Sequence, residues 1–185
     1  MKFVKNRKFA ILVSAAIVIL ATLFGIRGSI NRLARKTESM FYDGVYLVDE
    51  GYTQPGIDSQ LKNRINSALG YALLLESHPE LEKASSELLS AQRELIDAES
   101  IRAKYSANER LQRAFLKLAE NAEKANLSQR DADAAEQYAS TFMGAYTMIQ
   151  NSGYNQQARS YMSGASIFVR IIRPFLFVTP PQLFA

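Results

Sequence analysis

The chain has 185 residues, with 22 Lys and Arg, 18 Asp and Glu, and no Cys. The absence of Cys excludes disulfides, thiolate metal sites and lipid attachment through a lipoprotein cysteine. The charges are segregated: residues 1–36 and 137–185 contain no acidic residue, whereas residues 37–136 hold eighteen acidic residues against eleven basic ones. Because this acidic centre would repel phosphate, the composition argues against a nucleic-acid partner.

The first element along the chain is an apolar run. Residues 1–8 form a basic tail with four Lys and Arg, and residues 9–26 contain no charge. A helix over 9–26 would be about 27 Å long, enough to cross a bilayer core. A secretory signal peptide is the alternative, but the run exceeds the usual apolar length and ends in a poor cleavage site. The sequence predicts a single-pass, uncleaved transmembrane helix that binds membrane lipid.

The orientation of this helix is weakly marked, because four basic residues lie on each side of the apolar run. The positive-inside rule therefore discriminates little. The near-side charges are closer to the run, and the free amino terminus adds one more. We expect a cell-membrane location with the N-terminus inside and the body outside the cytoplasm; a cytoplasmic body is the alternative.

Beyond the anchor, apolar residues recur at alternating three- and four-residue steps, which indicates helices with one buried face. The first stripe runs from Ile30 to Leu47, so the first body helix is expected to continue directly from the membrane span. Pro55 and its glycine neighbours then break it. We expect no β-strand. Later stripes begin at Ile57, Leu81, Leu111 and Ala135.

These stripes predict an all-α fold, in which the transmembrane helix continues into an elongated, antiparallel four-helix bundle. The heptad from Leu81 to Ala98 also fits a coiled coil between copies, so a homo-oligomer stays possible. Pro79 either kinks one long helix or separates two, and Pro174 must end the last helix.

Helix starts are indicated by three serines. Ser77 and Ser106 each precede a Glu by three residues, the spacing of a capping box. Ser128 is expected to be an N-cap, with acidic residues in the first turn behind it.

The end of the chain carries a family resemblance. Tyr154-Asn155, Ala158, Tyr161 and Phe168 have the spacing of the closing motif of LemA-family proteins. The chain departs from that motif at two positions: Met162 replaces the second Asn and Val169 replaces Pro. Two earlier parts are similar as well, Asn31 with Leu33 after the apolar run, and Gly70-Tyr71-Ala72 in mid-chain.

The resemblance implies a bacterial, single-pass, membrane-anchored four-helix body without established enzymatic activity. It also implies that Pro79 kinks one long second helix, and that the C-terminal tail returns to the membrane. The expected organisation is a basic tail over 1–8, a transmembrane helix over 9–26, a LemA-like helical bundle over 27–173 and a Pro-containing apolar tail over 174–185.

The aromatic residues of this region have two readings. Tyr154, Tyr161 and Phe168 are seven residues apart and share a helix face, which fits core packing; Asn155 would then make a hydrogen bond inside the bundle. The other reading is a surface that docks on a membrane or a partner. We prefer docking for the segment after Pro174, because Pro180-Pro181 should stop it folding into the bundle. The interface candidates are Tyr154, Asn155, Tyr161, Phe168, Arg170, Arg173, Phe175 and Phe177.

Catalytic patterns are missing from the sequence. His78 is the only His, and it does not stand in a Glu-x-x-His motif of the kind that binds two irons in a helical bundle. There is no Gly-rich phosphate loop and no Gly-x-Ser-x-Gly elbow. We therefore expect neither an enzyme, nor a cofactor, nor a metal site.

Two functions fit these observations. The first is a membrane-anchored scaffold or interaction protein of the bacterial envelope, which docks a membrane-protein partner through the bundle surface or the C-terminal tail. The second is an extracytoplasmic ligand-binding helical domain of the kind found in sensors. It would need a polar cleft, which the tyrosines Tyr42, Tyr46, Tyr138 and Tyr146 could line.

Overall fold

The structure is a computed structural model that describes residues 7–47, 51–163 and 180–185. Over these ranges the chain is mostly helical, which confirms the expected class. The elements in chain order are α1 (Arg7–Asp43), β1 (Val45–Leu47), β2 (Tyr52–Gln54), α2 (Ile57–Leu75), α3 (Glu82–Ile96), α4 (Ile101–Lys124), α5 (Gln129–Gln150) and α6 (Tyr154–Ser163).

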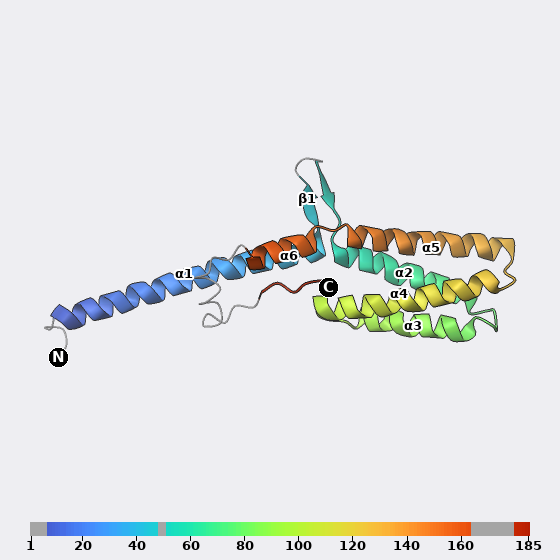
Figure 1. The fold of residues 1–185 in the computed structure, drawn as a ribbon, viewed down its shortest axis with the longest axis horizontal. Helices are drawn as coiled ribbons and strands as arrows, with labels where there is room; N and C mark the ends of the chain where they lie inside the picture. The colour runs from blue at the N-terminus through green and yellow to red at the C-terminus, as the bar shows by residue number, and fades with distance from the viewer. Residues whose placement is uncertain (1–6, 48–50, 164–179) are drawn as a thin grey trace.

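The N-terminal helix α1 is long, apolar and uncovered. It has 37 residues, and it runs without interruption from the expected membrane span into the part that contacts the rest of the protein. The most apolar 18-residue stretch of α1 contains no buried residue. Among the described residues α1 is the one helix long and apolar enough to cross a membrane. Figure 1 shows it as an extension that projects away from α2–α5.

A short hairpin follows α1, which the sequence analysis did not expect. Strands β1 and β2 are antiparallel, with Tyr46 opposite Thr53. The helix predicted from the first stripe therefore ends at Asp43, and the stripe's last residue, Leu47, belongs to β1. Gly44 explains the break: its φ of +89° leaves the helical region, and a Cβ there would lie 2.1 Å from the carbonyl oxygen of Gln54. The expectation of no β-strand was wrong.

Helices α2 to α5, which we call the helical body, enclose the main core. Helix α2 packs on both α3 and α5, and α3 packs on α4; Figure 1 shows the four helices side by side, elongated along one axis. Phe115 of α4 and Phe142 of α5 stack with ring centroids 3.8 Å apart, and Tyr71 of α2 lies 4.7 Å from Phe115. The apolar stripes predicted from the sequence thus supply this core.

Pro79 lies in an exposed turn between α2 and α3, and these two helices pack against each other. It therefore separates two helices, and the kink implied by the family resemblance was wrong. Prolines restrict the residue before them, so the chain reverses there more readily than it continues as a helix.

The helix starts agree with the sequence in one case of three. The Ser128 hydroxyl accepts a hydrogen bond of 3.2 Å from the backbone N–H of Asp131, as expected of an N-cap. Ser106 lies inside α4, which is capped instead by Ser100. Ser77 does not cap α3, because the residue before that helix is Leu81 and its side chain cannot accept a hydrogen bond.

The last stripe is divided by Asn151–Gly153, so α5 and α6 are separate helices. Helix α6 leaves the helical body and packs alongside the second half of α1 (Figure 1). The Tyr161 hydroxyl donates to the carbonyl oxygen of Ile30 at 3.2 Å. Pro174, expected to end the last helix, lies outside the described residues.

Candidate functional site

Three elements meet at the point where α1 joins the helical body, and the C-terminal segment Pro180–Ala185 lies against them. We call the surface that holds it the tail-docking site. It consists of Phe41 at the end of α1, Arg102 and Tyr105 at the start of α4, and Tyr154 and Asn155 at the start of α6.

Backbone hydrogen bonds hold the segment in place. The Asn155 side chain pairs with both polar groups of Phe184: its Nδ2 donates to the carbonyl oxygen at 2.7 Å, and its Oδ1 accepts from the N–H at 2.9 Å. The Tyr154 hydroxyl donates to the carbonyl oxygen of Gln182 at 2.6 Å. An extended segment has no internal hydrogen-bond partners for its backbone N–H and C=O groups. The side chains of Tyr154 and Asn155 supply these partners, as a neighbouring strand would in a sheet.

The Gln182 side chain adds a contact from α4. The backbone N–H of Arg102, in the first turn of α4, donates to Gln182 Oε1 at 3.2 Å. This N–H is one of the orphan donors that every helix has at its N-terminus. The segment therefore joins α4 to α6 through hydrogen bonds to two different helices.

The Phe184 ring is the apolar anchor of the segment. It is 4% exposed, and its centroid lies 5.3 Å from that of Tyr105 and 5.7 Å from that of Phe41. Tyr154 completes the cluster, with its ring edge-on to Phe41 at 5.4 Å. Burying a Phe side chain is worth about 1.5–3 kcal/mol, so the ring contributes much of the docking energy.

Burial, together with the nearby Glu38 and Tyr42, raises the pKa of Tyr154. The phenol therefore stays protonated, and its O–H remains a donor to Gln182.

The predicted interface residues fall into two groups. Tyr154 is buried and Tyr161 and Asn155 are half-buried, and their contacts are with α1 and the C-terminal segment, outside the helical body. Phe168, Arg170, Arg173, Phe175 and Phe177 lie outside the described residues.

Pro180-Pro181 were expected to stop the last residues folding into the bundle, and residues 180–185 dock instead where α1, α4 and α6 meet. Pro181 is buried, and the segment docks in an extended form. Prolines do prevent a helix, but they favour the extended conformation that side-chain donors and acceptors can bind.

A second polar group lies inside the helical body. The guanidinium of Arg64 on α2 is fully buried and donates to Asn108 Oδ1 and Gln112 Oε1, both on α4. It also lies over the ring of Phe142 on α5, 4.1 Å from the centroid, with Tyr146 at 5.0 Å. Arg64 therefore joins three helices at one point.

The charge of Arg64 is stabilised by uncharged groups, namely two amide oxygens and an aromatic ring. None of the ion pairs found within the described ranges includes this residue. Burial lowers its pKa to about 10, although Glu109 and Tyr146 act in the opposite direction, so the group is still protonated at neutral pH. Arg64 Nε and Asn108 Nδ2 are buried donors for which the described part of the chain offers no acceptor.

An ion-pair cluster lies where the helical body meets the end of α1. Asp58 on α2 is paired with Lys62 at 2.9 Å and with Lys104 on α4. Lys104 Nζ is also 5.7 Å from the ring centroid of Tyr42 on α1. Burial alone would raise the pKa of Asp58, but the hydrogen bonds and charges of the two lysines outweigh it and lower the pKa.

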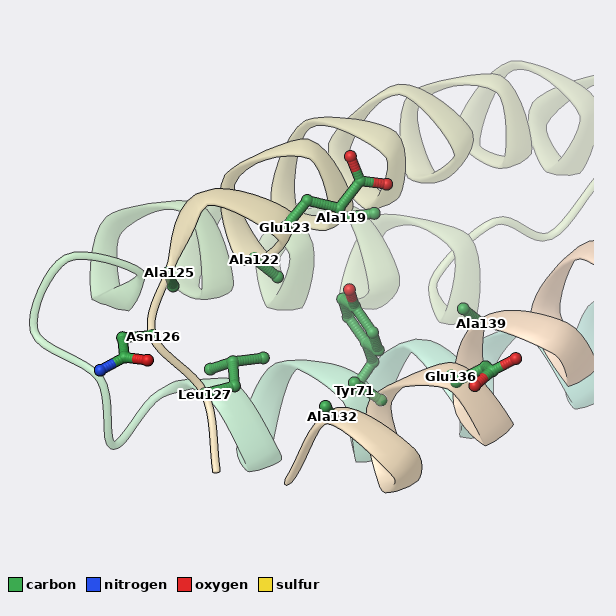
Figure 2. Close-up of a pocket in the computed structure, with 11 residues that line it drawn as sticks. Tyr71, Ala119, Ala122, Glu123, Ala125, Asn126, Leu127, Ala132, Glu136 and Ala139 are labelled. Atoms are coloured by element: carbon green, nitrogen blue, oxygen red, sulfur yellow. The ribbon is translucent and has the colours of Figure 1, made fainter. Parts of the chain in front are cut away.

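A cavity of about 460 Å³ lies at the other end of the helical body, beside the α4–α5 connection. Figure 2 shows the Tyr71 ring standing between α4 and the helices below it, with Glu123 and Glu136 on opposite sides. Most of the remaining lining consists of alanines. Burial, with the charge of Glu123, raises the pKa of Tyr71.

This cavity differs from the cleft that the ligand-binding alternative required, because its lining includes none of Tyr42, Tyr46, Tyr138 and Tyr146. In the parts of the chain that the structure describes, no three His, Cys, Asp or Glu side chains come close enough to hold a metal ion.

The sequence pointed to only part of the tail-docking site. Tyr154 and Asn155 were singled out by their motif, whereas Phe41, Tyr105 and Phe184 were not. Their contacts join α1, α4 and the end of the chain, and no local pattern reports contacts over such separations.

Comparison with known proteins adds no relative: no family model, no curated protein and no solved structure matches the chain.

Proposed function

We propose that the chain is a membrane-anchored, non-catalytic scaffold or interaction protein that holds its helical body next to a membrane. The observation that carries this proposal is the surface of α1. Its most apolar stretch contains no buried residue, whereas Leu61, Leu88 and Leu111 of the helical body are buried. Apolar surface of that extent is stable in lipid and costly in water, at about 25 cal/mol per Å².

The proposal treats α2–α5 as a rigid antiparallel four-helix bundle. The support is the packing of α2 on α3 and α5, the stacked Phe115–Phe142 pair and the three-helix contact of Arg64. A bacterial source and membership of the LemA family are part of the proposal, and they depend on the motif residues alone.

The proposed docking face for a membrane-protein partner is the outer side of α2. Leu69 and Leu73 are one helical turn apart and are 38% and 54% exposed. Two neighbouring exposed leucines on one helix form the kind of apolar patch that protein partners cover.

Site-specific photo-cross-linking in intact cells tests this proposal. A photoreactive residue at Leu73 should give one discrete product with an integral membrane protein, and the same residue at the exposed Lys83 of α3 should not. Equal labelling at both positions, or none at Leu73, would contradict docking through this face. Protease accessibility of the helical body in intact and lysed cells would establish its side of the membrane.

Ligand binding in the Tyr71 cavity is a second candidate, favoured by one observation. The cavity volume of about 460 Å³ lies within the range of small-molecule sites. A thermal-shift screen of the purified chain against small molecules should then find a ligand whose stabilising effect disappears when Ala122 is changed to Phe, which would fill the cavity. Ala114→Phe, elsewhere on α4, is the control.

A further inference from the structure

The contacts of the C-terminal segment are those of a bound peptide. Backbone groups of Gln182 and Phe184 pair with Tyr154 and Asn155, and one apolar side chain enters an aromatic cluster. Peptide-binding proteins hold extended ligands in this way, with backbone hydrogen bonds for affinity and a side-chain anchor for specificity. The two prolines reduce the conformational freedom that the segment loses when it docks.

The docked segment and α6 are separated along the chain by residues 164–179. A chain of that length spans at most roughly 55 Å. None of the contacts between the segment and the tail-docking site depends on which copy of the chain provides the segment. A second copy within that reach offers the same hydrogen bonds and the same Phe184 ring.

The position of the site on α1 favours such a neighbour. Phe41 lies on the same continuous helix as the apolar stretch, roughly 22 Å along the axis from Ile26. Copies anchored through α1 in one membrane would all hold their tail-docking sites and their C-terminal segments at the same height and in the same orientation. Confinement to a surface raises the effective concentration of each segment near the neighbouring sites.

We propose that the tail-docking site binds the C-terminal segment of a second copy, so that neighbouring copies are linked by exchanged tails. Exchange of an identical segment is a low-cost route to an oligomer, because every contact of the closed chain is preserved. The partner in this proposal is a second copy of the chain. The proposal therefore goes beyond the scaffold function, in which another membrane protein docks on the outer side of α2.

Cysteine cross-linking tests the exchange directly, since the chain has no Cys of its own. One tagged copy carries Arg102→Cys and a second, differently tagged copy carries Gln182→Cys. The two native residues are exposed and adjacent, with Arg102 N and Gln182 Oε1 3.2 Å apart. After co-expression, mild oxidation of membranes should give a covalent product that carries both tags.

Two controls define the contact. Arg113→Cys, which is exposed farther along α4, replaces Arg102→Cys and should reduce the mixed product at least tenfold. Phe184→Ser, added to the copy with Gln182→Cys, should reduce it similarly, because the anchor ring is lost. The helical content of this variant in detergent, measured by circular dichroism, should stay that of the parent chain.

A chain that carries both cysteines completes the test. If it forms only an internal disulfide, and mixed copies never cross-link over a range of expression levels, the site serves its own tail and the exchange proposal fails. Mixed product that persists with Phe184→Ser would show random collision, and would overturn the proposal as well.

Discussion

Phe24 on α1 and Phe115 on α4 are the same residue type in opposite surroundings: Phe24 is 67% exposed, and Phe115 is 1% exposed. The apolar stretch of α1 over residues 9–26 has no buried side chain, whereas most large apolar side chains of the helical body are buried. The comparison teaches that one chain can combine an exposed and a buried apolar surface, and that the boundary on α1 lies near Ala34, its first buried residue.

The largest expected effect comes from the same substitution in the two regions. Phe115→Ala removes a ring stacked on Phe142 and should lower the free energy of unfolding by about 3–5 kcal/mol. Phe24→Ala should leave it within about 0.5 kcal/mol, because no core is disturbed. Urea unfolding in mild detergent, followed by circular dichroism, measures both. Equal losses would mean that α1 is part of the folded core.

For insertion into a membrane we expect the opposite order: a substitution in α1 should have a large effect, and one in the helical body a small effect. Val18→Arg places a charge at the middle of the apolar stretch and should cost about 2.5–3.5 kcal/mol of insertion free energy. Leu116→Arg, on the exposed surface of α4, is the matched control and should change insertion little. The fraction of protein in carbonate-washed membranes measures the difference. Unchanged fractionation of Val18→Arg would contradict the role of α1 as an anchor.

Arg64 is the exception inside the helical body, since it is a buried charge in an apolar core. Arg64→Met keeps much of the volume but leaves the side-chain oxygens of Asn108 and Gln112 without a donor, so we expect a loss of about 2–3 kcal/mol.

Adding Asn108→Leu and Gln112→Leu to the Arg64→Met variant should restore most of the lost stability, because the polar groups that Arg64 had paired are then removed. Urea unfolding of the single and triple variants gives both numbers. A triple variant no more stable than the single one would show that Arg64 contributes through its charge.

The smallest effect on the free energy of unfolding is expected for Asp58, which lies where the helical body meets the end of α1. The lowered pKa of Asp58 means that its ion pairs stabilise the fold above the ordinary carboxyl pKa of 3.8, and that this stability is lost as the pH falls through the folded-state value. Asp58→Asn should therefore cost about 1–2 kcal/mol near pH 7 and much less near about pH 3. Unfolding curves at the two pH values measure this; a cost independent of pH would exclude the ion pairs as its cause.

The sequence predicted where apolar side chains are exposed and where they are buried, because each arrangement leaves a strong local pattern. An uncharged run over 9–26 and apolar stripes such as Leu81 to Leu95 need only a helical period to be recognised, and the structure places the first outside and the second inside. Ser128 was predicted as a cap for the same reason, since its partner Asp131 is three residues away.

The features that the sequence analysis missed have different physical origins. The hairpin depends on Gly44, whose positive φ no apolar period reports. Arg64 lies three residues after Leu61, outside the apolar stripe predicted for α2, and its partners lie on α4, so its burial could not be read from α2 alone. The docked tail depends on Asn155 finding Phe184, and the proline pair between them suggested separation.

The continuity of α1 has a mechanical consequence. A single helix of 37 residues has no joint between the expected membrane span and its end at Asp43, and the first break in the chain comes at Gly44, before the helical body. Membrane helices tilt by about 20° on average, and such a tilt about the bilayer centre would carry the Asp43 end sideways by roughly 13 Å. A tilt of α1 would then act as a lever and set how far its Asp43 end, which lies beside the tail-docking site, is displaced across the membrane surface.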